Sequence, residues 1–196
     1  KGKKFKLMKI KNTIKNKNKL LKLKLIKTKI YKKNYTFKQL KIEDIEHRLK
    51  KGLQIIYKYH INNKRILFIS TSSTLEMKIK NLLTNVKHLF ISQYFWLNGQ
   101  ISNKQQFLSK KISYNKISKL KNKSNLIVIL DKLVDKNIIK ESYKAKIPII
   151  FLGDNLNIFE TNSSYKIPGN FMLNRKKLRD NFFLVLLKGI IQKKVN

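Results

Sequence analysis

Short runs of apolar residues, each about as long as one strand, recur along the second two-thirds of the chain. Unbroken apolar runs are typical of parallel strands that are covered on both faces of a sheet. They predict five strands, at residues 65–70, 89–92, 125–130, 147–152 and 165–167. Pro148 is compatible with the fourth strand because it lies near the start of that strand.

Between these runs, apolar residues recur at three- and four-residue spacing, which is the period of a helix with one buried face. The first such stripe runs from Ile42 to Ile56, with acidic residues in its first turns, where the helix dipole favours them. Gly52 lies inside this stripe and is expected to weaken the helix. Ser73 and Glu76 have the spacing of a capping box at the start of a second helix. Two more helices are expected, at about residues 134–143 and 174–190, with Tyr143 on the apolar face of the first and Val185 on that of the second.

Strands that alternate with helices through short connections predict an α/β domain with a parallel sheet and helices on both faces. We expect this domain to span residues 39–196. Residues 1–38 form a basic N-terminal extension, with fifteen Lys and no acidic residue between Lys1 and Lys33. The alternation of Leu and Lys over residues 21–25 predicts a short strand in this extension that orders on RNA.

The charge balance indicates a polyanionic partner. The chain has 46 Lys and Arg against 10 Asp and Glu, which gives a formal net charge of +36. Such a body repels itself and favours nucleic acid, whose counterions are released on binding. An AT-rich genome explains the abundance of Lys, Asn and Ile but not the shortage of acids. An anionic membrane surface fits less well, because no helix has sharply divided basic and apolar faces.

The usual enzyme motifs of α/β proteins are absent. The first strand-to-helix turn, residues 70–73, has no glycine, and no phosphate-binding loop, nucleophile elbow or cysteine occurs. No His has a partner at metal-ligand spacing, so solvated or capping roles are expected for His47 and His60. We therefore predict no catalytic residue, metal, cofactor or small-molecule substrate. The alternative is a nucleic-acid-processing α/β enzyme with Asp131 and Asp154, which follow two of the strands, as metal ligands; turn hydrogen bonding is the simpler role for both.

Candidate RNA-binding residues combine cations with aromatic and amide side chains. The segment after the second strand, residues 93–104, offers rings that stack on bases and amides that bond to base edges. For Trp96, a place in the core is an equally good interpretation. Cations at residues 175–179 oppose the dipole of the last helix, which suggests a phosphate partner. The predicted RNA-binding residues are Lys32, Lys33, Lys64, Arg65, Ser72, Gln93, Tyr94, Trp96, Asn98, Gln100, Asn103, Lys104, Lys110, Lys111, Arg175, Lys176, Lys177 and Arg179.

Three of these segments resemble, in order, motifs of the universal small-subunit ribosomal protein two family. Residues 65–71 are similar to the family's strand ending in Phe-Val-Gly-Thr. Residues 96–103, Trp-Leu-Asn-Gly-Gln-Ile-Ser-Asn, are similar to Trp-Leu-Gly-Gly-x-Leu-Thr-Asn. Residues 167–170, Ile-Pro-Gly-Asn, are identical to the family's tetrapeptide. The resemblance covers about Ile42 to Ile191, and the family's helical hairpin is reduced to a Lys-rich stretch at residues 110–123.

The resemblance implies a flavodoxin-like three-layer fold, with five parallel strands in the order 2-1-3-4-5. It also implies a non-catalytic structural constituent of the small ribosomal subunit that contacts rRNA and neighbouring ribosomal proteins. Together with the AT-driven composition, it favours a bacterial-type organellar ribosome. We therefore expect a ribosome-associated protein of the mitochondrial matrix, with no membrane partner.

Overall fold

The structure, a computed structural model, describes Leu21 and residues 42–71, 73–102, 123–130, 136–153, 164–169 and 182–192. The strands are β1 (Ile66–Ser70), β2 (Leu89–Ser92), β3 (Leu126–Ile129), β4 (Ile149–Gly153) and β5 (Tyr165–Pro168). The helices are α2 (Ile42–Ile61), α3 (Ser73–Leu82), α6 (Lys136–Lys144) and α7 (Phe182–Ile191), with a 3-10 turn, η1 (Gln93–Phe95), after β2.

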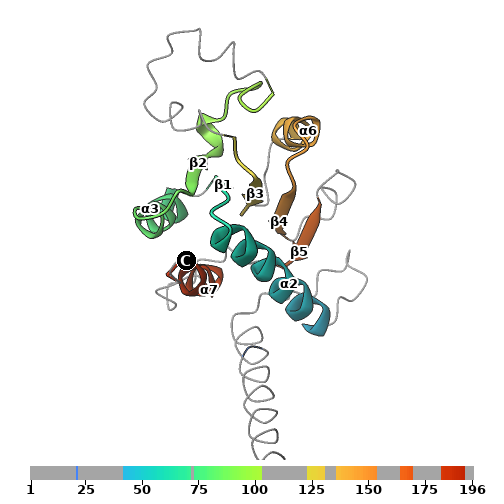
Figure 1. The fold of residues 1–196 in the computed structure, drawn as a ribbon. Helices are drawn as coiled ribbons and strands as arrows, with labels where there is room; N and C mark the ends of the chain where they lie inside the picture. The colour runs from blue at the N-terminus through green and yellow to red at the C-terminus, as the bar shows by residue number, and fades with distance from the viewer. Residues whose placement is uncertain are drawn as a thin grey trace, which may run out of the picture.

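The five strands form one parallel sheet in the order β2-β1-β3-β4-β5, so the α/β, flavodoxin-like fold is confirmed (Figure 1). Every residue of the inner strands β1, β3 and β4 is buried. The edge strands β2 and β5 each have partly exposed residues. This difference explains why the inner strands carry unbroken apolar sequence, since both of their faces are covered.

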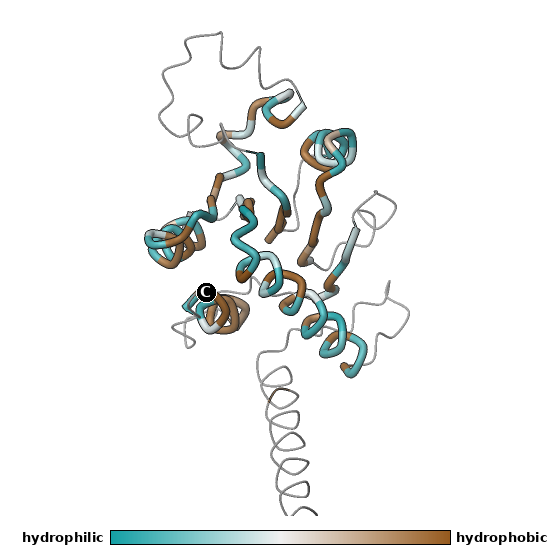
Figure 2. The backbone as a smooth tube through the Cα atoms, in the orientation of Figure 1, coloured by the Kyte–Doolittle hydropathy of each residue, from teal (hydrophilic) through white to brown (hydrophobic). Residues whose placement is uncertain are grey.

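Two hydrophobic clusters cover the two faces of the sheet. Helices α2, α3 and α7 pack on one face, against side chains such as Phe68 and Val128. Helix α6 covers the other face together with Trp96, against side chains such as Ile69 and Ile127. Figure 1 shows this division, and Figure 2 shows hydrophobic residues gathered on the strands and on α7.

Gly52 has a different role from the one predicted, because it is a close-packing position. A Cβ added there would lie 2.4 Å from Ile167 Cδ1, and Ile167 on β5 is fully buried. The missing side chain therefore lets α2 approach the edge of the sheet. The Tyr165 hydroxyl donates a hydrogen bond to the Arg48 carbonyl at 3.0 Å and joins the same two elements.

Two details of the predicted pattern are wrong. Tyr143 and Val185 were placed on the buried faces of their helices but are 60% and 49% exposed. Leu21, the described residue of the extension, is helical and packs against the cluster that holds α2. The rest of the extension, and the part of the last helix before Phe182, lie outside the described residues. No helix in the described ranges is long and apolar enough to cross a membrane.

Candidate nucleic-acid interface

A row of exposed lysines marks the amino-terminal edge of the sheet. Lys64, Lys87, Lys123 and Lys146 each lie two or three residues before one of the strands β1, β2, β3 and β4, and all four are exposed. Because the strands are parallel, their first residues lie along one edge. Four neighbouring strands spaced about 4.8 Å apart spread this row over about 14 Å. Arg65 lies beside Lys64 and is half-buried.

Two helix ends deliver cations to this edge. At the end of α2, the Lys64 N–H donates to the Tyr59 carbonyl, and the Asn63 N–H donates to the His60 carbonyl. This is a Schellman arrangement, with Asn63 in the left-handed region at φ 53°.

The end of α6 repeats the motif. There the Ile147 N–H donates to the Ser142 carbonyl, and the Lys146 N–H donates to the Tyr143 carbonyl. Lys146 itself occupies the left-handed position, at φ 53°. Glycine is the usual residue at such a position, because it has no Cβ to strain.

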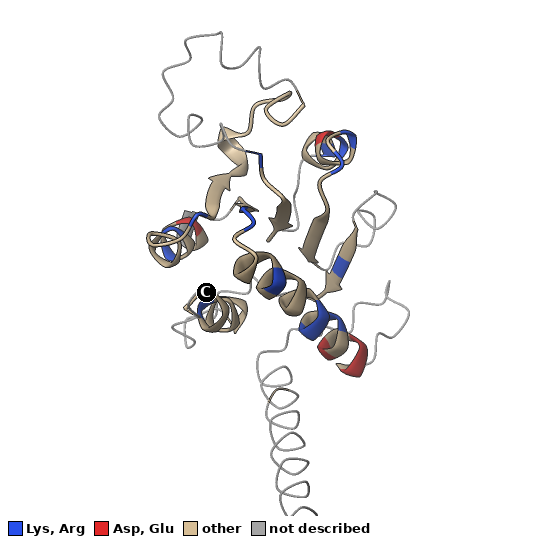
Figure 3. Cartoon of the chain, viewed as in Figure 1, with Lys and Arg blue, Asp and Glu red and all other residues tan. Residues whose placement is uncertain are grey.

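Two of the acidic residues form ion pairs with lysines of their own helices. Glu46 pairs with Lys50 at 2.7 Å, and Glu76 pairs with Lys80, each within one helix. Among the described residues, Figure 3 shows acids at the start of α2 and at single places on α3 and α6, against basic residues on the helices, on β5 and in segments that lead into the strands. The lysine row therefore lies in a strongly positive surface. Lysines in such a row are suited to the phosphates of a nucleic-acid strand, because phosphate contacts carry charge without selecting a base sequence.

The segment after β2, where aromatic stacking was predicted, divides into exposed and buried parts. Tyr94 is 80% exposed and Asn98 is exposed, so both are accessible to a partner. Trp96 is 9% exposed and belongs to the cluster beneath α6, which favours the core interpretation for its ring. Gln100 is 4% exposed, and Gln93 is half-buried.

Glu141 on α6 holds this segment in place. Its carboxylate accepts hydrogen bonds from the Gly99 N–H at 2.6 Å and from the Ile101 N–H at 3.3 Å. Gly99 has φ 87°, a conformation that lets the backbone turn and present both N–H groups to one side chain. The turn at residues 97–101 is therefore anchored to the helix that covers the sheet.

Three buried polar atoms of this segment have no hydrogen-bond partner among the described residues: Gln93 Oε1, Trp96 Nε1 and Gln100 Nε2. The Gln100 Oε1 atom accepts from the Leu97 N–H at 3.4 Å, which leaves the amide nitrogen as the unused donor. A buried donor without an acceptor costs about 1–3 kcal/mol, so such groups call for a ligand, a water or another part of the chain.

His60 and His88 form a buried pair that the sequence did not reveal. The Ile66 N–H donates to His88 Nδ1 at 3.3 Å, so in the neutral ring the proton is on His88 Nε2, which donates to His60 Nδ1 at 2.9 Å. Burial, followed by the nearby His60 and Arg65, lowers the pKa of His88 to about 4. The prediction of a solvated or capping His60 is wrong, because the ring is 2% exposed and bonded to a residue 28 positions away.

The structure does not gather the predicted RNA-binding residues into one place. Lys64 and Arg65 lie at the amino-terminal edge, whereas residues 93–100 begin at the carboxyl end of β2 and pack under α6. Lys87, Lys123 and Lys146 are absent from the sequence-predicted set. Their signal was a lysine shortly before each strand, which gains meaning only once the strands are known to be parallel neighbours.

The remaining predicted residues lie outside the described ranges. They are Lys32, Lys33, Ser72, Asn103, Lys104, Lys110, Lys111, Arg175, Lys176, Lys177 and Arg179. Asp131 and Asp154, the metal ligands of the enzyme alternative, also lie outside them. Within the described part of the chain, no group of three His, Asp or Glu residues is placed to hold a metal ion.

Comparison with known proteins adds no relative. No protein-family model matches the chain, and no curated protein matches it. The fold, the lysine row and the three motifs are therefore the observations from which a function is inferred.

Proposed function

We propose that this protein is a non-catalytic, rRNA-binding structural constituent of the small subunit of an organellar, mitochondrial ribosome. The observation that carries the proposal is the row of Lys64, Lys87, Lys123 and Lys146 along one edge of the parallel sheet. It gives a protein with net charge +36 a defined surface for phosphates, opposite the edge where α/β enzymes bind their substrates.

Two further observations support the ribosomal assignment. The strand order 2-1-3-4-5 is the order that the resemblance to small-subunit ribosomal protein two implies. The motif at residues 96–103 begins with the buried Trp96 and continues into the turn that Glu141 anchors, so its first half has a structural role in this fold. Contact with neighbouring ribosomal proteins and a place in the mitochondrial matrix belong to the same proposal.

The proposal predicts a phosphate-dominated interaction. Lys contacts phosphate as a point charge and lacks the two-pronged geometry of Arg, so affinity should depend strongly on salt and weakly on base sequence. The first test is a salt titration of the full chain with structured small-subunit rRNA. An affinity that barely changes between low and high salt would contradict the phosphate mechanism.

A matched pair of variants tests the surface itself. The edge variant replaces Lys64, Lys87, Lys123 and Lys146 with Gln. The control variant replaces four exposed lysines on helices, Lys78, Lys136, Lys140 and Lys188, and so removes the same charge. We expect the edge variant to reduce the slope of log affinity against log salt by about 3, and the control by less than about 1. An equal reduction of the salt slope in both variants would indicate general electrostatic attraction without a defined interface.

The ribosomal setting is tested by fractionation. The chain should co-sediment with the small ribosomal particle of its own organelle at moderate salt, and mass spectrometry of the purified particle should find it there. Co-sedimentation with anionic vesicles instead of ribosomes would favour the membrane alternative. Metal-dependent cleavage of RNA that Asp154→Asn abolishes would favour the enzyme alternative.

A further inference from the structure

The two edge strands of the sheet, β5 and β2, differ in how well they are protected against pairing with a further strand. Strand β5 contains Lys166 and Pro168, and α2 packs against it through Gly52. Charged residues and proline are the usual means of stopping another strand from pairing with a sheet edge. Strand β2, Leu-Phe-Ile-Ser, has neither, and no strand of the described part of the chain lies beyond it.

The sequence around β2 is uncharged to a degree found nowhere else in the chain. No Lys, Arg, Asp or Glu occurs between Lys87 and Lys104, the longest such interval in a protein with 46 Lys and Arg. Tyr94 and Phe95 in this interval are 80% and 47% exposed. An uncharged, aromatic surface on so basic a protein fits a protein partner better than phosphate.

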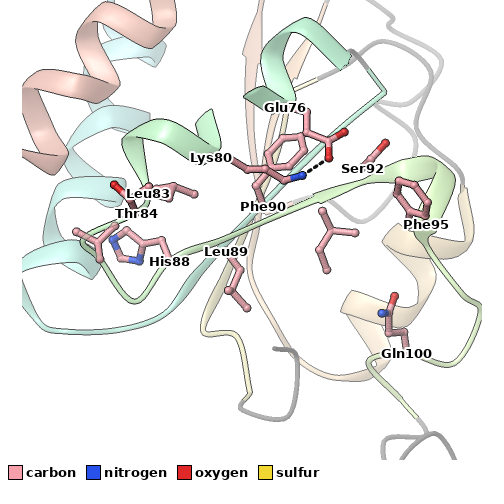
Figure 4. Close-up of a pocket in the computed structure, with 12 residues that line it drawn as sticks. Glu76, Lys80, Leu83, Thr84, His88, Leu89, Phe90, Ser92, Phe95 and Gln100 are labelled. Atoms are coloured by element: carbon pink, nitrogen blue, oxygen red, sulfur yellow. Dashed lines mark hydrogen bonds and ion pairs between the residues drawn. The ribbon is translucent and has the colours of Figure 1, made fainter. Parts of the chain in front are cut away.

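A groove of about 470 Å³ lies along β2. Phe90 packs with the cluster beneath α3, and Leu89 and Ile91 pack with the cluster beneath α6. All three line the groove, which therefore straddles both faces of the sheet at its edge. Figure 4 shows Phe90 beside the Glu76–Lys80 ion pair, with Leu89 and Gln100 on the other side of the strand.

The register places backbone groups of β2 at the open edge. The carbonyls of Arg65 and Ile69 accept hydrogen bonds from backbone N–H groups on the β3 side. Because the backbone groups of successive residues point to opposite sides of a strand, those of the even-numbered residues of β1 point toward β2. Phe68 is paired with Phe90 in parallel register, and in such a ladder it bonds to the two neighbours of Phe90. The N–H and carbonyl of Phe90, and the N–H of Ser92, therefore point away from β1.

We propose that this edge accepts an extended, uncharged segment of another protein, which pairs with β2 as an added strand. Main-chain hydrogen bonds to Phe90 and Ser92 would supply affinity, and alternate apolar side chains of the partner would fill the groove. This inference goes beyond the RNA-binding proposal and does not rest on it.

The test uses the full chain and a defined probe, an uncharged peptide of alternating Val and Thr at millimolar concentration. The control peptide has the same side chains but is N-methylated at every residue, so neither of its edges can donate main-chain hydrogen bonds. Amide hydrogen exchange should slow at Phe90 and Ser92 with the first peptide only. Exchange at Leu89 and Ile91 should change little, because their amides already face β1.

Protein variants supply the second arm. Phe90→Pro removes the N–H that points outward, and Phe90→Leu retains it while keeping an apolar side chain. We expect the proline variant to weaken peptide binding about tenfold and the leucine variant to retain it, while rRNA affinity stays unchanged in both. Equal binding of the N-methylated peptide, or no binding to the folded wild-type chain, would overturn the inference. So would protection of the Phe90 amide in the free protein, because another part of the chain would then cover the edge.

Discussion

His60 Nδ1 lies 2.9 Å from His88 Nε2, so the last turn of α2 and the residue before β2 are joined inside the protein. The Ile66 N–H completes the chain of hydrogen bonds by donating to His88 Nδ1. The pair therefore fixes the amino-terminal edge of the sheet, next to Lys64 and Lys87 of the lysine row. Its geometry requires a neutral His88, since a protonated ring has no acceptor for Ile66.

Stability should fall as pH decreases from 6.5 towards 4. In this window the unfolded chain binds a proton at His88, whose ordinary pKa is 6.5, whereas the folded protein, with a pKa of about 4, does not. The free energy of unfolding therefore decreases with falling pH by up to about 3 kcal/mol. Above pH 6.5 the neutral His88 makes its full contribution to stability. Urea unfolding at pH 7, 6 and 5 measures the effect. His88→Leu should flatten the dependence, and His47→Gln, at an exposed position, should retain it; an unchanged slope in His88→Leu would refute the assignment.

Gly52→Ala should destabilise the protein, although alanine is the better helix former. The added Cβ would meet Ile167 Cδ1 at 2.4 Å in a fully buried site, and overpacking costs about 1–3 kcal/mol against about 1 kcal/mol gained in propensity. Gly189→Ala on α7 is the matched control, because nothing lies within 4 Å of its Cβ, and it should raise stability by up to about 1 kcal/mol. Thermal melts of both variants test the contrast, and a stabilised Gly52→Ala would show that α2 and β5 are not in close contact.

Glu141→Gln should loosen the turn at residues 97–101. The amide offers one oxygen acceptor where the carboxylate receives two N–H donors, so one of Gly99 and Ile101 loses its partner, at a cost of about 1–3 kcal/mol. Hydrogen exchange at these two amides should accelerate. Glu46→Gln, which breaks only an ion pair within α2, should change stability by less than about 0.5 kcal/mol. A similar loss of stability in the two variants would argue against the role of Glu141 as the anchor of the turn.

Lys146→Gly should separate folding from RNA binding. Glycine relieves the left-handed conformation at φ 53° and should stabilise the protein by about 0.5–1 kcal/mol. Loss of one phosphate contact should lower the salt slope of rRNA binding by about 1. Higher stability with unchanged RNA affinity would remove Lys146 from the interface.

The apolar pattern by itself determined the elements and their class. The five strands were predicted within two residues at each end, and the apolar runs of the inner strands β1, β3 and β4 were clearest because those strands are covered on both faces. Periodicity also located the helices, but it placed Tyr143 and Val185 on the wrong faces, since the pattern alone does not fix how a helix is rotated against its neighbours.

Only the tertiary structure decided the features that depend on which strands pair and on which distant residues come into contact. Only parallel neighbours turn four separate lysines into one row, and only the sheet order leaves β2 at an edge without Lys or Pro. Residues 28 and 42 positions apart meet in the His60–His88 and Glu141–Gly99 contacts, and no local pattern encodes such distances. Composition thus indicated a polyanionic partner, whereas the fold determined that four lysines lie along one edge of the sheet, because chain reversal by helices brings distant strand starts together.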